Sequence, residues 1–258
     1  MATKIQASKI ATVEELPELP QDISFFLPLM RHEVKETLES GGETYVSRDQ
    51  GGAVNGVFIY DEYEATGTIF TKSRDVFDFF YKMKPSSYIF SELEAAELEK
   101  ETWNIWELDV EKAQTEHVFK YRVAIVNDAA AIERFMSIAQ PETNKAWIRV
   151  ALRNGDKCFA VKVAGKIVGI AWMSIVGDVA RSHGLFVVPW FRNKGMMLDN
   201  YYARLIYLKA RRVRRLVNEI ADDNVASVGL AKKEGEKVAG KIFLYASPEE
   251  ETQPKASV

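Results

Sequence analysis

The chain has 258 residues, of which 47% are hydrophobic and 28% are charged, so it is long enough for one large domain or two smaller ones. Its longest apolar stretches, such as residues 167–176, are well short of the roughly 20 residues that span a bilayer, and residues 1–20 lack the apolar core of a secretion signal. The single cysteine, Cys158, excludes an intrachain disulfide and suits a packed strand residue in a reducing compartment. We therefore expect a cytoplasmic protein without a membrane span.

Charge divides the chain in two. Residues 1–117 contain 11 Lys or Arg and 23 Asp or Glu, whereas residues 118–258 contain 23 and 14. A uniformly solvated surface does not require this asymmetry, so we expect an anionic ligand to bind the second half. Mutual attraction between the two halves is the alternative explanation.

The two halves share a spacing of glycines. At an offset of 113 residues, 44–60 aligns with 157–173, and each stretch has the pattern of a strand, a glycine turn and a second strand. The glycines that coincide are Gly42, Gly52 and Gly56 in the first half and Gly155, Gly165 and Gly169 in the second. The spacing predicts a weak internal repeat, although two unrelated glycine hairpins would also match in this way.

Helical patterns precede both hairpins, at residues 25–40 and 128–140, with Asp128 as an N-cap. Residues 92–112 are rich in Glu and are predicted to end the first half and form a linker. After the second hairpin the pattern predicts, in order, a strand, a helix, a strand, a helix and a strand at 180–189, 196–213, 215–220, 224–235 and 238–246.

Residues 187–205 carry the clearest chemical signal. A strand ends at Pro189 and a helix begins near Gly195, so unbonded backbone amides and the positive end of the helix dipole point to one place. Gly195 allows a phosphate to approach the backbone, and Arg192 and Lys194 add positive charge. The competing interpretation is an ordinary strand-to-helix turn with solvated charges. The glycine patterns of dinucleotide sites and P-loops are not found in the required setting.

These features resemble the GNAT N-acetyltransferase superfamily. Arg192 and Gly195, which follow the strand 185–189, match its pyrophosphate motif [QR]-x-x-G-x-[GA], but Met197 stands where the family has Gly or Ala. Residues 218–236 are similar to the pattern L-E-V-x-x-x-N-x-x-A-x-x-L-Y-x-x-x-G-F of N-terminal acetyltransferases of the ribosomal alanine type. The positions that match it or carry close substitutes are Glu219, Asn224, Ser227, Leu230 and Gly235.

The resemblance implies an α/β (α+β) fold with a mixed central sheet flanked by helices and, with the glycine repeat, two tandem GNAT-like units. The predicted domains are a degenerate GNAT-like domain at 1–115, an acyl-CoA-binding GNAT domain at 116–247 and a disordered tail at 248–258. Residues 79–84, which lie 113 positions before the pyrophosphate loop, contain no glycine, so we expect the first domain to bind no cofactor.

Acetyl-CoA is the cofactor that the resemblance implies, and no metal is expected. The residues it assigns to cofactor binding are Leu185, Phe186, Val187, Arg192, Asn193, Lys194, Gly195, Met196, Met197, Leu198 and Asn224. The predicted function is transfer of an acetyl group to a primary amine, either a small molecule or a peptide N-terminus. The sequence identifies neither the amine nor the oligomeric state.

Acetyl transfer requires a base, because an ammonium group cannot attack a thioester. Glu219 matches the family's base position and is the first candidate, although a solvated Glu at a strand end is an equally simple explanation. His183 is the second, because a free imidazole is the side-chain group whose charge changes near neutral pH. The Tyr that protonates the departing thiolate in the family is replaced by Ala231, which leaves Tyr245, Ser227 or water as the acid. The backbone amide of Val187 is the candidate oxyanion donor.

Two other functions remain open at this point. Since Ala231 replaces the usual acid, the strongest alternative is a non-catalytic acyl-CoA sensor. The third is an RNA- or ribosome-associated protein that uses the basic face of residues 192–215. Nucleic acid is not favoured, because Tyr201, Tyr202 and Tyr207 follow a helix rather than a flat stacking platform.

Overall fold

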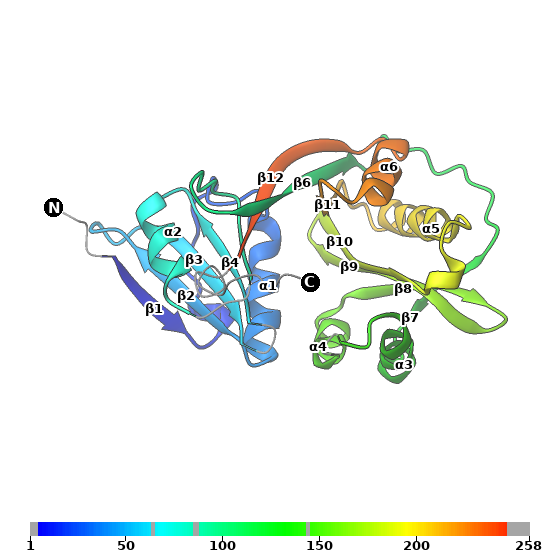
Figure 1. Ribbon diagram of the computed structural model, residues 1–258, viewed down its shortest axis with the longest axis horizontal. Coiled ribbons are helices and arrows are strands. Elements are labelled where there is room, and N and C mark those ends of the chain that lie inside the picture. Colours follow the sequence, from blue (N-terminus) through cyan, green and yellow to red (C-terminus); the bar gives the residue numbers. More distant parts are fainter. Residues whose placement is uncertain (1–4, 63–64, 85–87, 143–144, 247–258) are drawn as a thin grey trace, which may run out of the picture. The chain divides into compact units, whose positions relative to one another are not determined.

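The computed structural model describes residues 5–62, 65–84, 88–142 and 145–246, so the predicted disordered tail lies outside the described residues. The chain divides into two compact units (Figure 1). Unit 1 comprises residues 1–104 and 240–258, and unit 2 comprises residues 105–239. Among the described residues, no helix is both long and apolar enough to cross a membrane.

Unit 2 contains a mixed sheet with the strand order β6-β11-β10-β9-β8-β7. Its strands are β6 (Lys100–Asp109, shared with unit 1), β7 (Arg122–Val126), β8 (Lys157–Val163), β9 (Lys166–Val176), β10 (Val179–Val187) and β11 (Arg215–Ala221). Its helices are α3 (Ala129–Ala139), α4 (Ala146–Asn154), α5 (Met196–Ala210) and α6 (Val225–Lys233), with a short 3-10 helix η2 (Pro189–Phe191). Strands β7 to β10 are antiparallel, whereas β10 and β11 are parallel.

Helices α3 and α4 cover one face of this sheet, and α5 and α6 cover the other (Figure 1). The first face buries Cys158 and Trp172 against Ile132 of α3 and Ile148 of α4. The second face buries Phe159 of β8, one position along from Cys158, against α5. Successive residues of a strand point to opposite faces of the sheet, and helices cover both faces here, so neighbouring residues such as Cys158 and Phe159 are both apolar. Burial raises the pKa of the Cys158 thiol to about 12, which fits a packing role.

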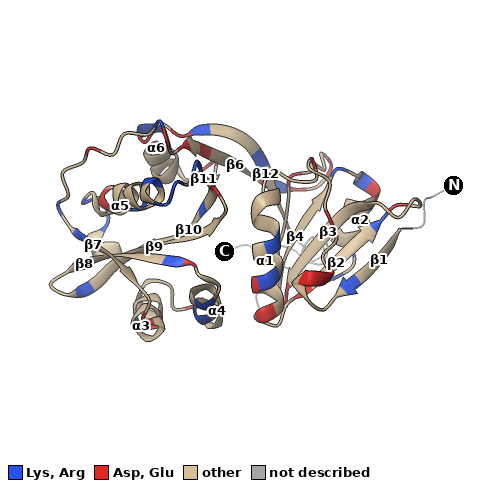
Figure 2. Ribbon diagram, turned by 180° about the vertical axis from the view of Figure 1, so that it is seen from behind, with Lys and Arg blue, Asp and Glu red and all other residues tan. Residues whose placement is uncertain are grey.

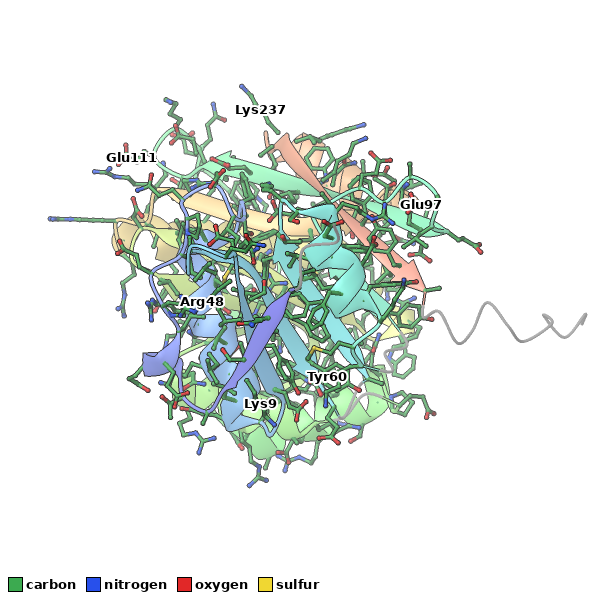
Figure 3. All side chains as sticks on the ribbon, turned by 90° about the vertical axis from the view of Figure 1, so that its left-hand side faces the viewer. Lys9, Arg48, Tyr60, Glu97, Glu111 and Lys237 are labelled. Atoms are coloured by element: carbon green, nitrogen blue, oxygen red, sulfur yellow. The ribbon has the colours of Figure 1, made fainter. Side chains whose placement is uncertain are left out.

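Unit 1 has the strand order β1-β2-β3-β4-β5-β12. Its strands are β1 (Gln6–Ile10), β2 (Glu43–Arg48), β3 (Val54–Asp61), β4 (Thr66–Thr71), β5 (Tyr88–Ser91) and β12 (Lys237–Ala246), and its helices are η1 (Val13–Glu15), α1 (Leu27–Glu39) and α2 (Arg74–Tyr81). Phe58 of β3 and Phe77 and Phe80 of α2 form its aromatic core with Tyr245. On its surface, Lys9 of β1, labelled in Figure 3, and Lys84 both pair with Glu43 of β2.

The units differ from the contiguous predicted domains because two strands cross between them. Residues 92–112 are not a linker, because they contain β6. The residue directly after this strand, Val110, donates its amide to the Arg214 carbonyl in unit 2. In β12, Phe243–Ala246 pair with Tyr88–Ser91 of β5 and therefore complete the sheet of unit 1. Pairing between segments about 100 to 150 residues apart leaves no local pattern, so the sequence did not reveal either crossing.

The predicted repeat is present in both units at the hairpins. Strands β2 and β3 correspond to β8 and β9, and their turns contain Gly52 (φ 85°) and Gly165 (φ 78°), a backbone conformation that favours glycine. A Cβ at Gly56 would lie 2.5 Å from Val76 of α2. One at Gly169 would lie 3.2 Å from Met197 of α5. Both glycines therefore admit a helix close to the sheet.

The offset of 113 residues ends after the hairpins. It equates residues 79–84 with the pyrophosphate loop, but α2 already begins at Arg74, so 79–84 lie at its C-terminal end. The segment between the hairpin and this helix is shorter in unit 1. Most other predicted elements are found within a few residues of their expected bounds, and Asp128 caps α3 by accepting a bond from the Ala131 amide. Helix α4 was not predicted.

Candidate functional site

A pocket of about 500 Å³ lies in unit 2 where α5 and α6 begin. It is lined by the ends of α3 and β10, the η2 loop and the first turns of both helices. Nine of the eleven residues predicted to bind the cofactor line it, namely Leu185, Phe186, Val187, Arg192, Asn193, Lys194, Met196, Met197 and Asn224. Gly195 is the N-cap of α5, and Leu198 follows in its first turn. The structure thus brings the predicted binding residues to one place.

The N-terminus of α5 is open to an anion. Its N-cap, Gly195, has a φ of 81° and provides no capping side chain, and Asn193 also has a positive φ, 59°. The amides of the first turn therefore have no side-chain partner at the cap, and the helix dipole favours negative charge there. Met197, which departs from the family motif, fits because Gly169 leaves space for it on β9.

Strand β10 separates from β11 beside this pocket. Their parallel pairing covers Val179–Arg181 and Arg215–Val217, and β10 continues beyond it to Val187. A β-bulge between His183 and Phe186 bends β10 here, with Gly184 at a φ of 56°. A Cβ at Gly184 would lie 2.9 Å from the Trp172 ring, so both space and conformation require glycine. The stretch 182–187 can therefore offer backbone groups to an extended ligand.

His183 belongs to a polar cluster on β10 and its neighbours. Ser174 of β9 donates its hydroxyl to the Asp156 carboxylate at 2.8 Å and lies 3.1 Å from Nε2 of His183. The same Nε2 is 3.4 Å from Oδ2 of Asp156. Asp156 and Ser174 are 1% and 5% exposed, whereas the His183 side chain is 28% exposed. A buried carboxylate therefore holds one ring nitrogen of an accessible imidazole, an arrangement that orients a base.

Glu219 of β11, the first candidate base, is engaged differently. Its Oε1 lies 2.8 Å from Nε of Arg181 on β10, and its side chain is 11% exposed. Proton uptake by this carboxylate would forfeit a close ion pair. Glu219 is therefore held by a cation, whereas His183 is held by a carboxylate.

The two side chains that are candidate acids, and the position of the missing Tyr, occupy different environments. Ser227 lines the pocket, and its backbone amide donates to Oδ1 of Asn224, the N-cap of α6. Ala231, at the position of the family Tyr, is 3% exposed and packs with Trp106 and Ile220. Tyr245 lies in the core of unit 1, where its hydroxyl donates to the Leu93 carbonyl and accepts from the Ala95 amide. The structure does not bring Tyr245 to the pocket of unit 2.

The basic stretch after α5 is partly neutralised (Lys and Arg are blue in Figure 2). Arg214 lies 3.6 Å from Glu111, and Arg215 makes two bonds of 3.0 Å to Glu107. Both acids were counted in the acidic half of the sequence, yet they belong to unit 2. Part of the charge asymmetry therefore reflects pairing of β6 with its neighbours.

Comparisons with known proteins agree with this geometry. Residues 123–235 match the model of the Acetyltransferase (GNAT) family, so unit 2 carries a GNAT acetyltransferase domain. A search of curated proteins gives no match.

Solved structures extend the likeness to the whole chain. A tandem GNAT protein from the clavulanic acid biosynthesis pathway matches with a TM-score of 0.61 and 12% identity, covering 95% of this chain and 99% of that one. A GCN5-related N-acetyltransferase from Sphaerobacter thermophilus matches with a TM-score of 0.57 and 11% identity, covering 93% and 94%. A GNAT-family acetyltransferase from Colwellia psychrerythraea gives 0.55 and 11%, covering 95% and 99%. At these identities the likeness shows the fold, and it confirms the prediction of two GNAT-like units.

Proposed function

We propose that this protein is an acetyl-CoA-dependent N-acetyltransferase that acts on a primary amine through unit 2. The observation that carries the proposal is the pocket at the uncapped N-terminus of α5, beside the stretch of β10 that pairs with β9 but not with β11 and that also bears His183. The matched GNAT domain and the fold support acyltransferase activity in general. The acceptor is either a small molecule or a peptide N-terminus.

The residues of this pocket fit the groups of acetyl-CoA. The first-turn amides of α5, with Arg192 and Lys194 nearby, suit its pyrophosphate. The backbone of 182–187 suits the amides of its pantetheine arm, and Val187 is our candidate donor to the acyl oxygen. When bound, acetyl-CoA supplies an acetyl group activated as a thioester.

His183 is the proposed base. Because Ser174 and Asp156 contact Nε2, Nδ1 is the nitrogen that takes a proton from the ammonium form of the acceptor. Asp156 then stabilises the positive imidazolium. Ser227 lines the pocket, and its hydroxyl is our candidate acid in place of the missing Tyr.

The proposal is tested by titrating the full-length protein with acetyl-CoA in a calorimeter and then assaying thiol release with amines of both acceptor classes. We expect saturable binding with one site per chain, and thiol release that depends on an amine. No saturable binding would overturn the cofactor assignment. Binding without amine-dependent release across the panel would overturn the catalytic assignment.

A further inference from the structure

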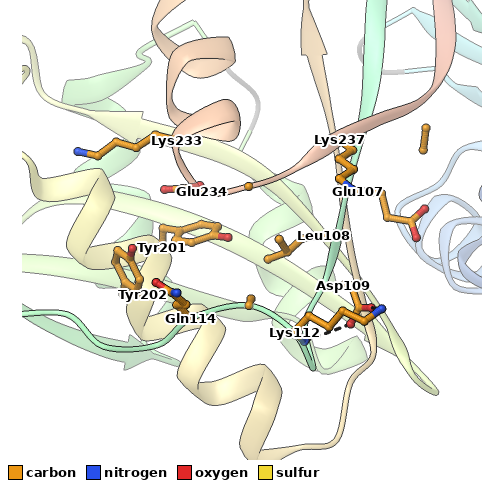
Figure 4. Close-up of a pocket in the computed structure, with 13 residues that line it drawn as sticks. Glu107, Leu108, Asp109, Lys112, Gln114, Tyr201, Tyr202, Lys233, Glu234 and Lys237 are labelled. Carbon is orange, nitrogen blue, oxygen red and sulfur yellow. Dashed lines mark hydrogen bonds and ion pairs between the residues drawn. The ribbon is translucent and has the colours of Figure 1, made fainter.

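Unit 2 contains a second pocket, of about 690 Å³, on the side of the sheet that α5 covers (Figure 4). Its walls come from the end of β6, the residues that follow it, the middle of α5, the last turn of α6 and the start of β12. It shares no lining residue with the acetyl-CoA pocket: α6 contributes Ala226, Ser227 and Leu230 to that pocket, and its C-terminal end to this one. A ligand here would therefore occupy a separate site.

Two buried polar atoms at this pocket have no hydrogen-bond partner among the described residues. One is the hydroxyl of Tyr201, a residue that is only 2% exposed, and the other is Oε1 of Glu234. Figure 4 shows the Tyr201 hydroxyl directed toward the middle of the pocket, with Glu234 above its ring. Leaving such groups unbonded is costly, so they mark a place where a ligand with N–H donors gains more than it would on an open surface.

The other polar groups of the pocket restrict the ligand's charge. Both oxygens of Glu107 are bonded to Arg215, and Asp109 is bonded to Lys112 (dashed in Figure 4), so these acids and the two cations compensate one another. The inner carboxyl of Glu234 makes no ion pair within the described part of the chain. Lys237, on the outer wall, makes no ion pair within the described part of the chain.

We propose that this second pocket binds a small zwitterion, with its ammonium group between Glu234 and Tyr201 and its anionic group toward Lys237. An ammonium has three N–H donors, enough to satisfy both unbonded oxygens. The inference does not depend on acetyl transfer, because the residues that carry it lie outside the acetyl-CoA pocket.

The ionisation of Glu234 provides a direct readout. Burial and then the nearby Glu236 raise the pKa of Glu234 to about 9, so this carboxyl holds its proton at pH 7.5 in the free protein. The other charged groups that face it are Arg204 of α5 and Lys233 of its own helix, and both act in the opposite direction. An ammonium placed beside Glu234 lowers its pKa, so binding releases a proton to the buffer.

The test is calorimetric titration of the full-length protein at pH 7.5 with ω-amino acids from glycine to 6-aminohexanoate, in two buffers that differ in ionisation enthalpy. The probe that binds best is then compared with the matched amine and the matched carboxylate. We expect saturable binding of the amino acid, at least tenfold tighter than either single-charge analogue, with release of up to one proton.

Glu234→Gln is a close mimic of the protonated side chain, so it should keep the thermal stability and the acetyl-CoA affinity while weakening the zwitterion at least tenfold and abolishing proton release. Tyr201→Phe should weaken it severalfold. The proposal is overturned if no member of the series binds, or if either single-charge analogue binds as tightly as the amino acid. It is also overturned if the Glu234→Gln variant binds the amino acid with unchanged affinity. Acetyl-CoA titration of the same variant reports separately on the proposed function.

Discussion

The two units keep the same hairpins and the same placement of the following helix, but they differ at that helix's N-terminus. In unit 1, the Ser73 side chain caps α2 by accepting from the Val76 amide, and Asp75 adds a negative charge to the first turn. In unit 2, Gly195 leaves the amides of α5 uncapped. A phosphate would meet an occupied, acidic helix end in the first unit and an open one in the second.

The two units also differ in how far the strand after the hairpin runs beyond its parallel pairing. In unit 1, the strand after the hairpin, β4, pairs with β5 as far as Ile69 and ends only two residues later, at Thr71, and the Ser91 hydroxyl of β5 bonds to the Ile69 carbonyl. In unit 2, pairing stops at Arg181 and β10 runs on to Val187. Packing glycines such as Gly56 and Gly169 are found in both units, whereas the features of a binding loop are found in one. A repeat can therefore preserve a fold without preserving its site.

The largest expected effect comes from closing the open helix end. Gly195→Asp should lower the acetyl-CoA affinity by about 100-fold or more, because it places a carboxylate where the amides and dipole favour an anion. Calorimetric titration measures it. Gly195→Asn has almost the same shape without the charge and tolerates positive φ, so its loss should stay within about tenfold.

The matched change in unit 1 is Ser73→Asp, which keeps a capping oxygen on α2 and should leave the acetyl-CoA affinity unchanged. Equal affinity of the Gly195→Asp and wild-type proteins would show that α5 is not the anion site. A loss of acetyl-CoA affinity in Ser73→Asp would show that unit 1 takes part in cofactor binding. The proposed difference between the two helix N-termini would then be wrong.

The next effect concerns the base on β10. His183→Gln should reduce turnover by on the order of 10²-fold while acetyl-CoA affinity stays within twofold, because a positioned base contributes about this much. Glu219→Gln should have a smaller effect, since its carboxylate is engaged by Arg181. Steady-state kinetics of both variants decide between them. The opposite ranking would return the base to Glu219, as the family pattern suggests.

Much of unit 2 was predictable because its signals are local. The N-cap Asp128, the Gly195 loop and the hairpin around Gly165 each depend on residues within one or two turns. Asp156 was missed as a partner of His183, because the contact joins the start of β8 to β10 across β9 and nothing in the sequence near either residue indicates it. The second pocket was missed for the same reason: Glu234 and Tyr201 meet only through the packing of α5 and α6.

The smallest effect tests where the last strand belongs. The sequence made Tyr245 a candidate acid. Its side chain is fully buried in the core of unit 1, where its hydroxyl donates to the Leu93 carbonyl and accepts from the Ala95 amide. Tyr245→Phe leaves that carbonyl and that amide without a partner, so it should lower the free energy of unfolding by about 1–3 kcal/mol, measured by urea denaturation. Turnover and acetyl-CoA affinity should not change. Tyr88→Phe, at an exposed position of the neighbouring β5, is the matched control and should alter stability by less than about 0.5 kcal/mol. A loss of turnover in Tyr245→Phe at full stability would mean that this hydroxyl acts in catalysis after all.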